Sequence, residues 1–148
     1  MEVFLQPIDK EHFEDTVNGT LNIDNIQCLS KKDRSELKKM FRNKTIYIWG
    51  VKEGVYTYWE QAKDQIEVYS ENPLCLFYQK KQFRSKGIIV KAIHNPKLGK
   101  ELWGDSDWEY IYFLKDVTDL FLPIEEYRKI TSSGTLAVQG FTRMAKPK

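Results

Sequence analysis

The sequence predicts an α+β fold, with five or six mixed strands curled into a small β-barrel and short helices beside it. Apolar runs rich in β-branched and aromatic residues recur along the chain, stretches of helical period separate them, and Asn-Pro and Asn-Gly steps interrupt the pattern. The chain has 148 residues, of which 41% are hydrophobic and 14% aromatic, enough for one core. We therefore expect one domain over residues 1–144 and a frayed tail or linker start over 145–148.

Strands are expected wherever apolar residues run unbroken or alternate. These stretches are residues 3–5, 45–51, 74–78, 83–93, 110–114 and 135–139, with a further extended segment over 21–26. The stretch 45–51 is the strongest, because it consists almost entirely of β-branched and aromatic residues.

Helices are expected between the strands. The chain after Asp9 has helical spacing up to Asn18, and Ser30 is placed to cap a helix that runs through residue 42. That second helix is expected to turn its apolar side chains inward, and these are Leu37, Met40 and Phe41. Shorter helices are expected over 56–62, over 98–103 before Gly104, and over 124–127 after Pro123.

Motifs of catalysis are absent from the sequence. It has no glycine-rich phosphate loop and no nucleophile elbow, and neither His12 nor His94 stands at metal-ligand spacing. A nucleophilic pair formed by Cys28 or Cys75 with His94 stays open, although two buried thiols are the commoner arrangement. We predict a non-catalytic binding domain with no cofactor and no metal.

Neither a membrane-spanning run nor a signal peptide is recognisable, so no membrane partner and a cytoplasmic location are expected. The net charge is only +2, but residues 27–100 hold sixteen Lys and Arg against seven Asp and Glu. A local basic face is what a phosphate backbone requires, although a solvated lysine-rich surface has the same composition. The predicted phosphate contacts are Lys38, Lys39 and Arg42, with Lys44 beside them, and Lys80, Lys81, Arg84 and Lys86.

Aromatic residues supply the second half of the predicted interface. Trp103 and Trp108 lie in a short segment with glycine, serine and aspartate neighbours, where an indole either plugs the barrel or stacks on a flat ligand. Trp49 and Tyr47 share one face of the strand over 45–51, and Trp59 lies in a short helix.

The order of these segments resembles the EVE/YTH group of PUA-like domains over about residues 45–122. The resemblance rests on the stretches 47–51, 74–78, 87–90, 102–105 and 110–117. The segments 4–7, 12–13, 16–17 and 138–141 are similar to the N-terminal specificity domains of archaeal McrB-type restriction ATPases. The chain holds no ATPase motif, so this resemblance implies an isolated reader domain.

The resemblance implies an aromatic cage for one nucleobase. Trp49 matches the first cage tryptophan, and Trp103 is the closest match to the second, with Trp108 as its competitor. Tyr47, Trp59 and Tyr78 are weaker wall candidates. Asp105 and Ser106, together with Asp107, are candidates for contacts with the edge of the base.

We therefore expect a DNA-binding domain that flips a modified base, 6-methyladenine in preference, into this cage as the specificity module of a McrBC-type system. The parent protein would be oligomeric through a missing ATPase domain, and the isolated domain monomeric. The main alternative is a PUA-like domain that reads modified or structured RNA. A small hydrolase or transferase using Cys75 or His94, and a protein-binding adaptor with tryptophan hot spots, are the other two.

Overall fold

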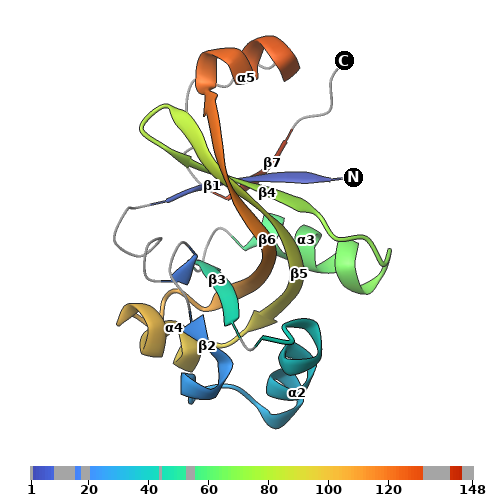
Figure 1. Cartoon of the computed structure of the whole chain (residues 1–148), viewed down its shortest axis with the longest axis vertical. Coiled ribbons are helices and arrows are strands. Elements are labelled where there is room, and N and C mark those ends of the chain that lie inside the picture. The colour runs from blue at the N-terminus through green and yellow to red at the C-terminus, as the bar shows by residue number, and fades with distance from the viewer. Residues whose placement is uncertain are drawn as a thin grey trace.

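One mixed sheet organises the part of the chain that the computed structural model describes, which is residues 2–8, 16–17, 21–43, 45–52, 56–131 and 141–144. Its strands are β1 (Val3–Pro7), β2 (Leu21–Asn22), β3 (Thr45–Val51), β4 (Leu74–Gln79), β5 (Gln82–His94), β6 (Tyr110–Pro123) and β7 (Thr142–Arg143). They lie in the order β2-β3-β6-β5-β4-β1-β7. β1 runs parallel to β4, and the other described pairings are antiparallel (Figure 1).

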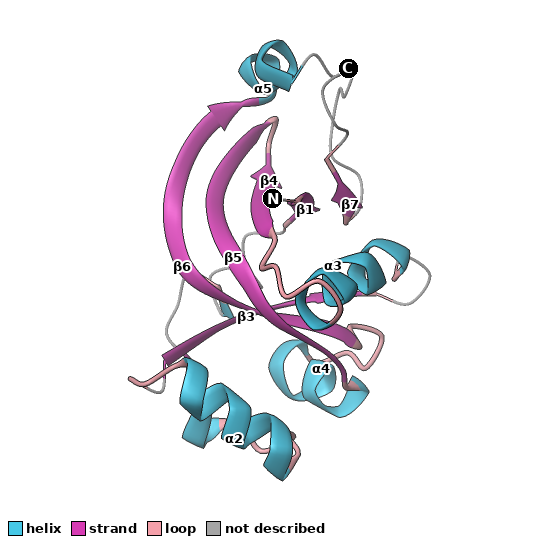
Figure 2. Ribbon diagram, turned by 90° about the vertical axis from the view of Figure 1, so that its right-hand side faces the viewer, coloured by secondary structure: helices cyan, strands magenta, loops and turns pink. Residues whose placement is uncertain are grey.

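The α+β class with a curled mixed sheet is confirmed, and among the described residues this sheet does not close on itself. The sheet is open, with β2 and β7 at its edges, and it has seven described strands rather than five or six. The two edge strands have two residues each, too few for a period-two pattern to be visible in the sequence. The curl comes from β5 and β6, two long strands that bend together (Figure 2).

The helices are α2 (Lys31–Met40), α3 (Thr57–Glu67), α4 (Pro96–Trp103) and α5 (Ile124–Thr131), with a short 3₁₀ helix η1 (Ile23–Asn25). The predicted cap of α2 is confirmed, since Oγ of Ser30 accepts a hydrogen bond from the Asp33 N–H at 3.1 Å. Met40 was expected inside but is 46% exposed, because Leu37 and Phe41 already fill the buried side. The expected helix over 10–17 and the expected strand over 135–139 lie mostly or wholly outside the described residues.

Both faces of the sheet are covered. Trp49, Tyr112 and Phe77 pack on one face with Trp59 of α3. On the other face, Ile48 and Phe113 pack with residues of α2 and α4, including Leu37 and Leu98. A third cluster, around Phe83 and Tyr127, attaches α5 to the far ends of β5 and β6. Alternate side chains of β3 thus enter different cores, which is why its sequence is apolar throughout.

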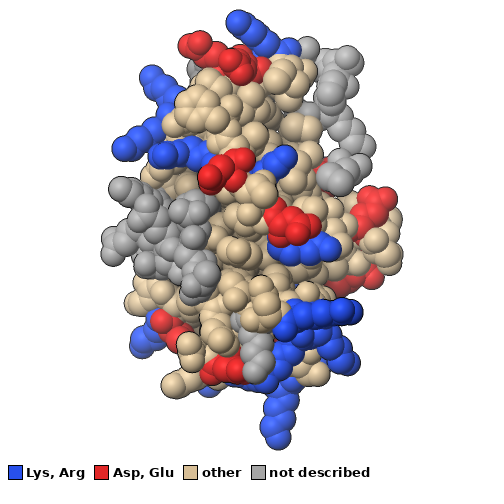
Figure 3. Space-filling view, viewed as in Figure 1, with Lys and Arg blue, Asp and Glu red and all other residues tan. Residues whose placement is uncertain are grey.

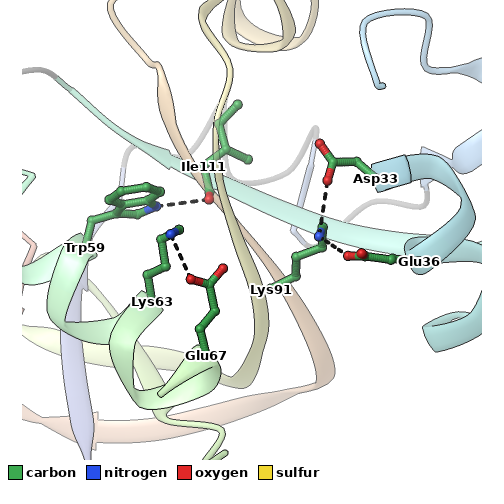
Figure 4. A network of polar contacts seen from close by, with 7 residues as sticks. All are labelled: Asp33, Glu36, Trp59, Lys63, Glu67, Lys91 and Ile111. Carbon is green, nitrogen blue, oxygen red and sulfur yellow. Dashed lines mark hydrogen bonds and ion pairs between the residues drawn. The ribbon is translucent and has the colours of Figure 1, made fainter. Parts of the chain in front are cut away.

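An ion-pair network ties α2 to the sheet. Nζ of Lys91, on β5, lies 3.2 Å from Oδ1 of Asp33 and also pairs with Glu36 (Figure 4). Burial lowers the pKa of Lys91, but the hydrogen bonds from the ammonium to these two carboxylates raise it further, so that the net pKa lies above its usual value. The lysine therefore stays charged and ties α2 to β5.

Candidate nucleic-acid interface

Three predicted pocket tryptophans meet beside the end of β3. The ring centroids are 6.1 Å apart for Trp49 and Trp103, 6.0 Å for Trp49 and Trp108, and 6.1 Å for Trp103 and Trp108. The rings are inclined by 52° to 68°, the edge-to-face and tilted arrangements that aromatic quadrupoles favour. We call these three residues the tryptophan cluster. The sequence left Trp103 and Trp108 as competitors, whereas the structure brings both to Trp49.

Glycines at two positions make room for the tryptophan cluster. A Cβ atom on Gly50 would lie 2.8 Å from Cζ3 of Trp103, and one on Gly99 would lie 2.1 Å from the carbonyl oxygen of Trp108. Both distances are far inside an ordinary contact of roughly 3.5 Å. Gly50 therefore lets the indole of Trp103 pack on β3, and Gly99 lets the loop that carries Trp108 pass close to α4.

The loop from α4 to β6 is shaped by its own hydrogen bonds. Gly104 ends α4 in the left-handed region with φ of 77°. Oδ1 of Asp105 accepts a hydrogen bond from the Asp107 N–H at 2.9 Å, and its carbonyl accepts one from the Trp108 N–H at 3.3 Å. Asp105 thus uses one carboxylate oxygen to fix the loop, whereas Ser106 is exposed. Their contacts with a base edge stay a prediction.

The tryptophan cluster is closed in this structure. Trp49 is 2% exposed, and the indole N–H of Trp103 is buried with no acceptor among the described residues. Nζ of Lys52 lies 4.9 Å from the centroid of the Trp108 ring, a cation–π contact. A buried N–H without an acceptor is unfavourable. A flat ligand can enter between these rings only if one of them moves.

The weaker wall candidates do not join the cluster. Trp59 is 4% exposed, and its indole N–H donates to the Ile111 carbonyl at 3.0 Å (Figure 4), so its burial in the core is complete without a ligand. Tyr78 is 7% exposed and packs edge to face on Phe83 in the α5 core. Tyr47 is half-buried and lines a groove between the end of α2 and β6, which is described below.

The predicted phosphate-binding residues form two separate patches rather than a rim around one cleft. Figure 3 shows Lys and Arg gathered over α2 and, at the other end of the molecule, over the β4–β5 hairpin. On α2, Lys38 pairs with Asp24 at 3.2 Å, while Lys39 is exposed. Lys44 lies outside the described residues.

The hairpin patch is built on an unusual turn. Lys80 and Lys81 have φ of 52° and 64°, both left-handed, at the two-residue turn between β4 and β5. Arg84 donates to the side-chain oxygen of Gln79 at 3.0 Å, and Lys86 is exposed. These four cations therefore project from one arm of the sheet, and their contact with phosphate stays a prediction.

A surface groove that the sequence did not predict lies between the end of α2 and the middle of β6. This α2–β6 groove has a volume of about 530 Å³, and its lining includes Arg42, Asn43, Tyr47, Lys115 and Asp116. Of these residues, only Arg42 and Tyr47 were predicted. Lys115 and Asp116 come from β6, which reaches this place through a long-range register that no local pattern reveals.

The enzyme alternative gains no support from the thiols. Burial raises the pKa of the Cys75 thiol strongly, and the contact of its Sγ with the hydroxyl of Tyr112 at 3.8 Å lowers the pKa only in part, so the nucleophilic thiolate is disfavoured. His94 instead bonds Oε1 of Glu109 through Nε2 at 2.6 Å and stacks on Tyr110.

Among the described residues, no group of three or more His, Cys, Asp or Glu is placed to hold a metal ion. None of the described helices is long and apolar enough to cross a membrane.

Comparison with known proteins gives one informative match. No protein-family model matches the sequence, and no curated protein matches it. Among solved structures, the N-terminal domain of Thermococcus gammatolerans McrB bound to m5C DNA matches with a TM-score of 0.69 and 13% identity. The match covers 98% of this chain and 91% of that one. The chain therefore has the PUA-like fold of an McrB N-terminal domain, as its resemblance to that family implied.

Proposed function

We propose that this domain binds DNA that carries a methylated base and holds that base in the tryptophan cluster, without performing a chemical step. The observation that carries the proposal is the cluster itself, in which Trp49, Trp103 and Trp108 converge at about 6 Å beside glycines that make room for them. The fold supports it, because the McrB domain of the same fold is described as bound to m5C DNA.

The closed cluster has to exchange its own ring contacts for contacts with the base. Each aromatic pair contributes about 0.5–1.5 kcal/mol, and a stacked base contributes roughly 1–3 kcal/mol. The exchange is therefore close to balanced, and the few kcal/mol needed to flip the base must come from contacts with the backbone. An acceptor on the base would also satisfy the buried N–H of Trp103.

A methyl group favours this environment. Methylation of an adenine amino group removes one donor hydrogen and adds apolar surface, and both changes lower the cost of leaving water. We keep 6-methyladenine as the expected ligand on that argument. The m5C in the McrB complex makes 5-methylcytosine the competing ligand, and the same physics holds for its apolar C5 methyl group.

Backbone contacts are assigned to the two basic patches and to Lys52 beside Trp108. Because the patches lie at opposite ends of the sheet, a duplex that touches both has to run along the molecule rather than across one end. Release of counterions from the phosphates makes the affinity fall with rising salt. We further propose that the domain is monomeric alone and acts as the specificity module of a McrBC-type restriction assembly.

Fluorescence anisotropy on matched oligonucleotides tests the proposal. The set comprises one duplex without modification, one with 6-methyladenine, one with 5-methylcytosine, and an RNA of the same sequence, each at two salt concentrations. Wild-type protein should bind one methylated duplex more tightly than the unmodified one. Trp108→Ala should remove that gain while Tyr69→Ala, at a tyrosine that is 65% exposed, keeps it.

Equal binding to all three duplexes would refute the reader function. A preference for the RNA that persists at high salt would move the domain to the RNA-binding alternative, because only RNA offers a 2′-hydroxyl group.

A further inference from the structure

The α2–β6 groove combines charges that are unpaired among the described residues with a half-buried aromatic side chain. Arg42 and Lys115 are both exposed, and within the described part of the chain neither forms an ion pair. Lys91 and Arg143, by contrast, are each held by carboxylates. The two groove cations therefore remain available for a phosphate group.

Tyr47 connects this groove to the tryptophan cluster. Its side chain is on the same face of β3 as Trp49, and two residues along a strand are separated by roughly 7 Å. That separation is about the span between neighbouring nucleotides of an extended strand. A groove of about 530 Å³ also lies in the usual size range of small-molecule sites.

Asp116 is held in the groove by a strained backbone. Lys86 pairs with Thr118 and Ile88 pairs with Lys115, so β6 has one residue more than β5 at this point, which is a β-bulge. The bulge places Asp116 at φ of 53°, a left-handed conformation that glycine adopts without strain. Aspartate is one of the residues that adopt this conformation most readily, so the bulge fixes the position of Asp116 at the groove.

The carboxylate of Asp116 is also uncommitted. It is exposed, and no donor among the described residues bonds to it. A carboxylate can only accept hydrogen bonds, and at the edge of a base it accepts from the N4 amino group of cytosine. Thymine presents a carbonyl oxygen at the same place, which a carboxylate repels.

We propose that the α2–β6 groove binds the nucleotide next to the methylated base and that Asp116 selects cytosine over thymine there. Arg42 and Lys115 bind its phosphate, Tyr47 stacks on its base, and Asp116 accepts the hydrogen bond from the N4 amino group. This inference rests on the proposed function, since it assigns the sequence context of the same DNA site.

The test uses duplexes that carry 6-methyladenine or 5-methylcytosine, with cytosine or thymine as the 5′ or the 3′ neighbour of that base. Binding is measured by anisotropy for wild type, Asp116→Gly and Ser70→Gly. Ser70 is an exposed residue with the same φ of 53°, so its glycine variant relieves the same backbone strain away from the groove. In both variants the relief of the left-handed φ is offset by the greater backbone entropy of glycine in the unfolded chain, so both should keep a stability close to that of wild type.

Wild type and Ser70→Gly should prefer a cytosine neighbour by about 5- to 150-fold, the range of one good base-edge contact. Asp116→Gly should lose that preference and keep its preference for methylated over unmodified DNA. An Asp116→Gly protein that still prefers cytosine overturns the inference. So does a wild-type protein that recognises methylation without regard to its neighbour, and that result leaves the proposed function intact. A wild-type protein that binds methylated and unmodified DNA equally tightly overturns both the proposed function and this inference.

Discussion

Replacement of Gly99 by alanine has two opposing effects on the stability of the fold: a gain in helix propensity and a steric clash. Gly99 lies inside α4, where exchanging glycine for alanine ordinarily stabilises a helix by about 0.5–1 kcal/mol. Here the added Cβ would lie 2.1 Å from the carbonyl oxygen of Trp108 and 2.8 Å from its carbonyl carbon. The obstacle is backbone, so the loop must retreat by roughly 1 Å or more before the contact becomes ordinary.

Overpacking of this kind costs about 1–3 kcal/mol and occasionally more. We place Gly99→Ala at the upper end, about 3 kcal/mol, because no side-chain rotation relieves the clash. Subtracting the gain in helix propensity leaves a net loss of about 2 kcal/mol. At about 2–4 °C per kcal/mol for a chain of this size, the melting temperature should fall by roughly 4–8 °C.

Gly104→Ala is the matched control. A Cβ atom on residue 104 would have no neighbour within 4 Å, so the cost of this change comes from the left-handed φ of 77° alone, about 1 kcal/mol. Urea denaturation followed by tryptophan fluorescence measures both variants, and near-ultraviolet circular dichroism reports the cluster, which only Gly99→Ala should disturb. A Gly99→Ala protein as stable as wild type would refute the reasoning.

Three further outcomes are expected. Gly50→Ala should cost about 1–3 kcal/mol in urea denaturation and weaken binding of methylated DNA, because its Cβ displaces the Trp103 ring. Glu101→Gln should reduce the loss of stability that wild type shows in thermal melts between pH 5 and 3. Burial raises the pKa of Glu101, but hydrogen bonds from the backbone N–H groups of residues 27–28 lower it by more, so the net pKa is below its usual value. The wild-type carboxylate therefore stabilises the fold above its unfolded pKa, and this stabilisation disappears as the pH falls. Cys75→Ala should reduce the loss of stability that wild type shows in thermal melts as the pH rises above about 8.5. Burial raises the pKa of the Cys75 thiol in the folded protein, so above that pH the thiol ionises only in the unfolded chain, which favours unfolding.

The sequence was most informative where structure is set locally. The cap at Ser30, the end of α4 at Gly104 and the core strand β3 all depend on residues within one or two turns of one another, and all three are confirmed. The meeting of Trp49 with Trp103 was predicted through a family pattern that fixes their order along the chain.

The remainder depends on contacts between distant segments. The clearances at Gly50 and Gly99 involve residues of another element or loop, so the closed state of the cluster could not be anticipated. The bulge at Asp116 follows from the register between β5 and β6. The two basic patches were predicted to flank one aromatic cleft but lie at opposite ends of the molecule, because a long hairpin carries one of them away from α2 (Figures 1 and 3).

The parallel pairing of β1 with β4 has a consequence for how the chain folds as it leaves the ribosome. Phe4 pairs with Cys75 and Leu5 pairs with Thr142, so the first strand must wait for segments made much later. At about 5–20 residues per second, synthesis takes roughly 4–14 s to reach β4 after β1 has appeared. Until then an apolar strand has no partner, which makes early capture by chaperones advantageous and predicts slow refolding dominated by long-range pairing.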